Sequence, residues 1–102
     1  MHDRDMHVKK CQAKLDEWRG LVDDLRARTP GMSDEERVHA QEAIAAMERT
    51  IDAGEECVAE TRSIEDGAWE AAKDDASAAW SMIEEAFEKN REATSFGSWH
   101  TQ

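Results

Sequence analysis

Residues 8–25 read VKKCQAKLDEWRGLVDDL, and apolar side chains recur in them at alternating spacings of three and four residues. These apolar positions are Val8, Cys11, Leu15, Trp18, Val22 and Leu25. A repeat of this kind is the heptad pattern of a helix that packs against other helices along one seam. It stops before Pro30, because the residue that precedes a proline is pushed out of helical geometry. The pattern therefore predicts a helix over residues 3–28.

A second helix is predicted to begin directly after Ser33. Ser33 and Glu36 stand at the two positions of a capping box, in which each residue's side chain bonds the other's backbone N–H. The apolar seam of this helix continues through Ala40, Ile44, Met47, Ile51, Gly54 and Val58. The predicted range is 34–62, and a connection of about five residues makes the first two helices antiparallel neighbours.

A third, amphipathic helix is predicted over residues 68–93. Its apolar stripe is formed by Trp69, Trp80, Ile83 and Phe87, with alanines between them. Residues 63–67 indicate a turn before this helix. The alternative is one continuous helix from residue 33 to about residue 93, which could not fold back on itself and would have to pair with another chain.

These patterns predict an all-α fold of three antiparallel amphipathic helices in a coiled-coil-like bundle. Residues 1–93 are expected to form a single helical domain, and residues 94–102 a flexible tail. Phe96 and Trp99 in this tail are interpreted either as part of a frayed end or as groups that dock against the bundle or a partner. The residues expected in the core or in an interface are Val8, Leu15, Trp18, Val22, Leu25, Ile44, Met47, Ile51, Val58, Trp69, Trp80, Ile83 and Phe87.

Composition limits the classes of function. The chain has 102 residues, of which 13 are Leu, Ile, Val or Phe, and its net charge is −11. Nucleic acid is disfavoured as a partner, because phosphates are bound by clustered Lys and Arg. No stretch approaches the roughly 20 apolar residues of a membrane span, so no membrane partner is expected. The polar start does not resemble a secretory signal and two cysteines do not make a disulfide framework, which together predict a cytoplasmic protein with reduced thiols.

Charge is distributed unevenly along the chain. Residues 1–28 have a net charge of +1, whereas residues 29–62 and 63–102 have −6 each. The first helix is therefore expected to lie between acidic helices, of its own chain or of another. Three long helices with few large aliphatic side chains are also expected to leave one side of the Ala/Trp stripe in water. Because exposed apolar strips mark interfaces, we expect a homo-oligomer, with a dimer favoured.

Several short motifs resemble those of a known group of proteins. Residues 14–19 read KLDEWR, residues 66–70 read DGAWE, and Trp80 is followed by Ala86 and Phe87. With the capped second helix, they resemble small bacterial coiled-coil-domain proteins, some of which are labelled stress-response proteins. The resemblance covers roughly residues 11–93. It implies a soluble bacterial protein with a helical hairpin and a third amphipathic helix, and it brings no catalytic residues. This chain departs from that pattern at Cys11 and Cys57 and in the low Lys content of its second helix.

Two groups of residues are candidates for metal binding. Glu36 and His39 have the Glu-x-x-His spacing of di-iron bundles, although His39 lies outside the core seam and Glu36 is already explained as a capping residue. His2, Asp3 and His7 form the second group, since two imidazoles and a carboxylate can bind Zn²⁺, Ni²⁺ or Cu²⁺.

The sequence offers no support for nucleophilic catalysis. Cys11 lies on an apolar seam, and the acidic neighbours of Cys57 should raise the pKa of its thiol. We therefore expect a non-enzymatic helical assembly or protein-interaction module without a cofactor, stress-associated if the resemblance holds and open to an additional, unknown protein partner. Two alternatives stay open: a metal-binding or iron-handling helical protein, and an acidic amphipathic protective protein that is partly disordered when alone.

Overall fold

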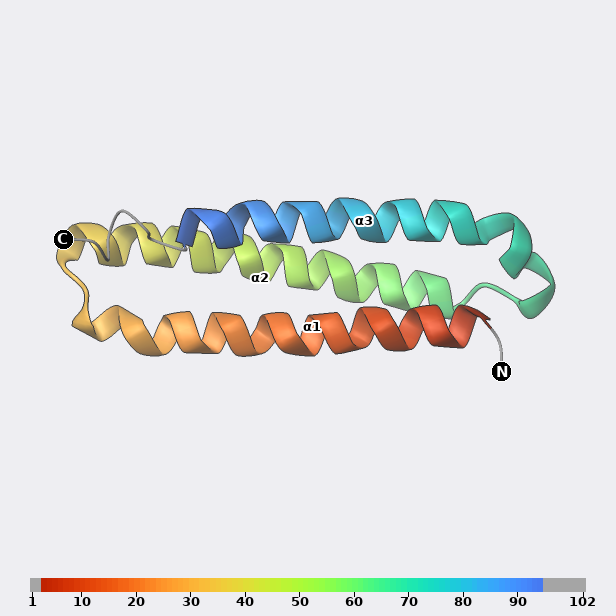
Figure 1. Ribbon diagram of the computed structural model, residues 1–102, viewed down its shortest axis with the longest axis horizontal. Helices are drawn as coiled ribbons and strands as arrows, with labels where there is room; N and C mark the ends of the chain where they lie inside the picture. The colour runs from red at the N-terminus through yellow and green to blue at the C-terminus, as the bar shows by residue number, and fades with distance from the viewer. Residues whose placement is uncertain (1–2, 95–102) are drawn as a thin grey trace.

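The computed structural model describes residues 3–94, which form three long helices packed side by side in a rod (Figure 1). Helix α1 spans Asp3–Arg28, α2 spans Asp34–Arg62 and α3 spans Trp69–Thr94. Two short 3₁₀ turns, η1 (Thr29–Gly31) and η2 (Asp66–Ala68), lie in the connections. Successive helices run in opposite directions, and the rod measures 55 × 19 × 18 Å. The predicted all-α fold with three antiparallel helices is confirmed; the predicted tail lies outside the described residues, except for Thr94 at the end of α3.

Proline and a capping box form the connection between α1 and α2. Pro30 lies in η1, and the N–H of Met32 donates to the carbonyl of Thr29 at 3.0 Å. Ser33 Oγ accepts from the N–H of Glu36 at 3.2 Å, and the N–H of Ser33 donates to the Glu36 carboxylate at 3.0 Å. These two bonds pair N–H groups that have no partner within the helix, so α2 begins at the residue after Ser33.

The chain turns again between α2 and α3, so the alternative of one continuous helix is wrong. The N–H of Ser63 closes the end of α2 by donating to the carbonyls of Ala59 and Glu60, each at 3.2 Å. Glu65 then adopts an extended backbone (φ −69°, ψ 150°), which interrupts the helix. Ala68 belongs to η2, and α3 therefore begins one residue later than its predicted start.

The first turn of α1 contacts the connection between α2 and α3. The guanidinium of Arg4 donates to the carbonyl of Ile64 and lies 2.8 Å from Asp66 Oδ1. The start of α1 is thereby fixed to the turn that joins α2 to α3.

The core runs along the rod between the three helices. Its buried side chains are Val8, Cys11, Leu15, Trp18, Val22, Leu25, Ala40, Ile44, Met47, Ile51, Val58, Trp80 and Phe87. Ile83 is partly buried against this cluster, and Trp69 is buried without belonging to it.

Aromatic rings join α1 to α3 inside the rod. Trp18 is 1% exposed, and its ring stacks on those of Trp80 and Phe87, with centroids 5.4 Å and 4.3 Å apart. Because α1 meets α3 through these rings, the helices form a bundle and not a flat layer. Within the predicted Ala/Trp stripe, Trp69 and Trp80 are buried at 7% exposure each, whereas Ala79 and Ala86 are exposed.

Candidate functional site

The amino-terminal metal candidates do not converge on a metal site in the described residues. The ring of His7 turns toward Cys11, with Nε2 3.6 Å from Sγ, and its centroid is 5.7 Å from that of Trp69. Within residues 3–94, no group of three or more His, Cys, Asp or Glu side chains could hold a metal ion, and this includes Asp3 and His7. His2 lies outside the described residues.

Glu36 and His39 do not form a di-iron site either. The Glu36 carboxylate accepts the N–H of Ser33, which is the capping role. His39 is exposed on the surface of α2, and neither residue belongs to a metal-binding group in the described part of the chain.

His7 and Cys11 form a contact that was not predicted, although their spacing of four residues on one helix was a signal for it. Burial lowers the pKa of His7, and Lys10 adds to this effect. Burial raises the pKa of the Cys11 thiol to about 11, with further contributions from Cys57 and Glu84. Imidazole and thiol are therefore both neutral at pH 7, unlike the thiolate and imidazolium of a catalytic cysteine. The pair fits a packing role.

Shallow grooves run along the face shared by α1 and α2, and ion pairs line them. Two of these grooves share Arg19 and Glu55, which form an ion pair between the helices. Arg26 and Glu48 form the next pair along the rod. The apolar seam beneath is closed, since Leu15 is only 2% exposed. This face thus presents charged side chains, among them the Arg19–Glu55 and Arg26–Glu48 pairs, and little apolar surface.

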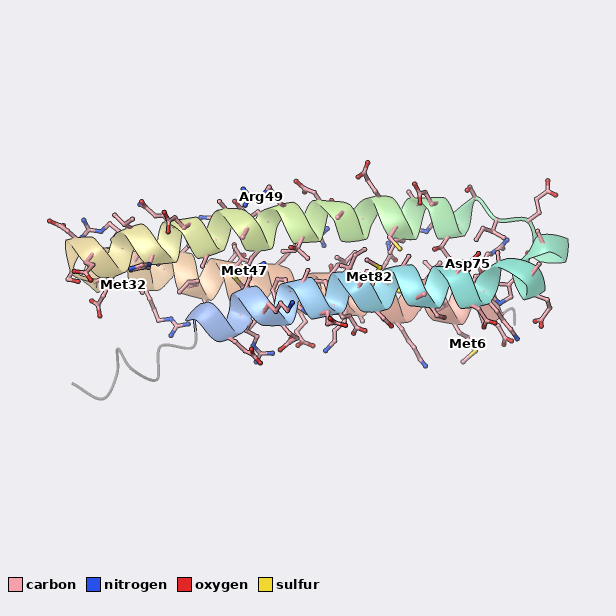
Figure 2. The ribbon with its side chains drawn as sticks, turned by 90° about the horizontal axis from the view of Figure 1, so that it is seen from above. Met6, Met32, Met47, Arg49, Asp75 and Met82 are labelled. Carbon is pink, nitrogen blue, oxygen red and sulfur yellow. The ribbon has the colours of Figure 1, made fainter. Side chains whose placement is uncertain are left out.

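Among the residues whose burial the structure describes, the large apolar side chain with the highest exposed fraction lies on α3. Met82 is 73% exposed, compared with 54% for Val38 and 47% for Met6. Asp75 and Lys89 lie seven residues before and after Met82 on the same helix, and all three side chains are exposed. Figure 2 labels Asp75 and Met82 on α3. Seven residues are nearly two helical turns, so these side chains point to the same side of α3. With three exposed alanines beside them they form what we call the α3 stripe: Asp75, Ala78, Ala79, Met82, Ala86 and Lys89.

The two charged side chains of the α3 stripe have no ion-pair partner among residues 3–94. Lys73 pairs with Glu70 at 3.0 Å and Arg91 with Glu88 at 3.4 Å, so neighbouring cations on α3 have acidic partners. The side chains of Asp75 and Lys89, by contrast, make no hydrogen bond or ion pair with any residue that the structure describes. The α3 stripe therefore combines an exposed apolar centre with one free charge of each sign.

Comparison of the sequence with family models, with curated proteins and with solved structures finds no match. None of the helices within residues 3–94 is long and apolar enough to cross a membrane.

Proposed function

We propose that this protein is a non-enzymatic helical assembly module that associates with a second copy of itself. The observation that carries this proposal is the α3 stripe, in which a methionine that is 73% exposed lies on the outer surface of an otherwise strongly charged bundle. Contiguous exposed apolar surface rimmed by polar side chains is typical of protein interfaces, and Ala78, Ala79 and Ala86 extend the apolar surface around Met82. A closed dimer is the commonest way for one chain to cover such a surface.

Charge alone does not require a partner for this chain. Arg4, Arg19 and Arg26 of α1 pair with Asp66, Glu55 and Glu48, and these ion pairs lie within one chain. The basic character of α1 is thus already used to offset the acidic helices beside it. The proposal depends for this reason on the apolar surface of α3 and not on the net charge of each segment.

The state of the cysteines supports a reducing compartment, and we place the protein in the cytoplasm. Cys11 and Cys57 are both free thiols. Burial raises the pKa of each of them, which keeps the thiols protonated and slow to oxidise. The resemblance to small bacterial coiled-coil-domain proteins supports a bacterial origin and an association with stress for this assembly.

Sedimentation velocity over a wide range of protein concentration tests the proposal. A monomer has a mass of 11.6 kDa, and we expect the weight-average mass to rise toward twice this value as concentration increases. Circular dichroism on the same samples should show full helicity at every concentration. A single helical species of 11.6 kDa at all concentrations would show that the chain does not self-assemble.

A further inference from the structure

We propose that two copies of the chain pair through their α3 stripes in antiparallel orientation. Met82 of each copy meets Met82 of the other on the two-fold axis, and Asp75 of each copy pairs with Lys89 of the other. This inference rests on the proposed self-assembly and specifies its surface, its orientation and its register.

The spacing along α3 fits this symmetry. In an antiparallel pair of identical helices, two residues face each other when they lie at equal distances on opposite sides of the axis. Asp75 and Lys89 are each seven residues from Met82, about 10.5 Å along the helix. When the axis passes through Met82, Asp75 therefore faces Lys89 twice, and Ala78 faces Ala86 twice.

Charge selects the antiparallel orientation. In a parallel pair with the same helix face, Asp75 would lie opposite Asp75 and Lys89 opposite Lys89, which places like charges together. In the antiparallel pair, both contacts join opposite charges, and neither Asp75 nor Lys89 makes an ion pair with another residue among residues 3–94. Complementary charges at an interface fix its register and exclude wrong arrangements.

The remaining residues of the α3 stripe permit a close approach. Ala78, Ala79 and Ala86 are exposed and small, so they keep little bulk between the two helices. The thioether of Met82 is flexible and adapts to an identical neighbour. Hydrophobic contact at the centre is thus enclosed by ion pairs at both ends.

The outer surface of α2 is the nearest competitor on this molecule. Arg49 is exposed there and makes no ion pair among the described residues, and Glu42 lies seven residues before it. An antiparallel pairing of α2 that joins Glu42 to Arg49 is centred between Ala45 and Ala46. It therefore lacks a large apolar side chain at its centre, and it also places Glu35 opposite Glu56. The α3 stripe has neither defect.

Charge reversal tests the proposed contacts. We expect Asp75→Lys and Lys89→Asp each to weaken the dimer by about tenfold or more, because each change replaces two attractive contacts with two repulsive ones. The double variant Asp75→Lys/Lys89→Asp exchanges the charges, and it should restore the dissociation constant to within about threefold of the original. Sedimentation velocity measures all three variants, and circular dichroism checks that each stays helical.

Two matched controls separate the α3 stripe from other surfaces. Asp74→Lys makes the same change of charge one residue away, on another side of α3, and should leave the dimer within about threefold of the original. Arg49→Glu reverses the free charge on α2 and should also have little effect. Loss of the dimer in Arg49→Glu, with Asp75→Lys unaffected, would overturn the inference in favour of α2.

Cross-linking tests the orientation independently of charge. With Cys57→Ser to remove the half-buried thiol, Met82→Cys treated with a mild oxidant such as oxidised glutathione should form a disulfide-linked dimer that a reducing agent cleaves, because the two Cys side chains meet on the axis. Ala71→Cys should not, since the antiparallel copies of this residue lie about 33 Å apart along the helices. Equal cross-linking of both variants would indicate a parallel pair and overturn the inference. A dimer whose dissociation constant stays the same in every variant of the α3 stripe would also overturn the inference, but it would leave the proposed self-assembly intact. A wild-type protein that stays monomeric would overturn the proposed function itself.

Discussion

Among the glycines within residues 3–94, Gly54 is the one whose lack of a side chain is required by the core. A Cβ atom at this position would lie 2.7 Å from Leu15 Cδ2 and 3.3 Å from Trp80 Cζ3. The space above Gly54 is thus filled by side chains of α1 and α3, and not by the backbone of a neighbouring helix. Its place on the heptad seam was visible in the sequence, but the identity of the side chains that fill its space depends on the three-dimensional packing.

We expect Gly54→Ala to destabilise the protein by about 1 kcal/mol. Alanine gains about 1 kcal/mol of helix propensity over glycine, whereas overpacking of a well-filled core costs about 1–3 kcal/mol. Gly20→Ala is the matched control, because nothing lies within 4 Å of a Cβ at this exposed position. It should stabilise the protein by about 0.5–1 kcal/mol. Urea denaturation of both variants measures the change in the free energy of unfolding. Equal stabilisation by both would show that the side chains around Gly54 shift at little cost to make room for a Cβ atom.

The thiol of Cys11 should make the protein sensitive to alkali. Burial raises the pKa of Cys11 from 9.0 to about 11, so the unfolded chain loses this proton at a lower pH than the folded chain. The protonated thiol of Cys11 contributes to the free energy of unfolding below about pH 9. This contribution is lost as the pH rises from about 9 through about 11. Denaturation curves measured across this range should show a steeper loss of stability in the wild type than in Cys11→Ala. Parallel curves for the two proteins would contradict the prediction.

The three helices could be predicted from the sequence because the interactions that form a helix join residues close together in the chain. The heptad seams and the capping box act over three to four residues, and they predicted three antiparallel helices correctly. The contact from Arg4 to Ile64 and Asp66 joins residues about 60 positions apart, and no local pattern indicates it.

The α3 stripe was missed for a different reason. The predicted apolar stripe of α3 included its alanines, but alanine is accepted both in cores and on surfaces. The tertiary structure places Trp69, Trp80 and Phe87 inside and leaves Ala79 and Ala86 exposed beside Met82. The regular spacing of Asp75, Met82 and Lys89 was present in the sequence. It indicates an interface only when all three side chains are known to be exposed and the two charged ones to be unpaired.

The capping box at the start of α2 should contribute measurably to stability. Ser33→Ala removes the oxygen that accepts the Glu36 N–H at 3.2 Å, and replacement of such a cap costs about 1 kcal/mol. Ser33→Asp keeps an acceptor at this position and should retain most of the stability. Thermal denaturation compares the two variants, and an equal loss in both would mean that the side chain of Ser33 does not cap the helix.

The whole molecule carries a net charge of −11 on a rod only 19 × 18 Å across. At an ionic strength of about 0.01 M, the screening length is about 30 Å, so acidic side chains on all sides of the rod repel one another. At about 0.1 M it is about 10 Å, which confines repulsion to near neighbours. The ion pairs between helices oppose this effect only weakly, because their side chains are substantially exposed, as for Arg19 at 43% and Glu55 at 49%.

Added salt should therefore stabilise the protein. We expect the melting temperature to rise by about 4–8 °C between these two ionic strengths, which corresponds to about 1 kcal/mol for a domain of this size. The measurement is thermal denaturation by circular dichroism at one low protein concentration, so that self-association does not contribute. Asp74→Lys reduces the net charge to −9 without touching the core or the α3 stripe, and it should show a smaller rise. A melting temperature that falls with salt would show instead that the ion pairs of α1 stabilise the rod more than its acidic surface destabilises it.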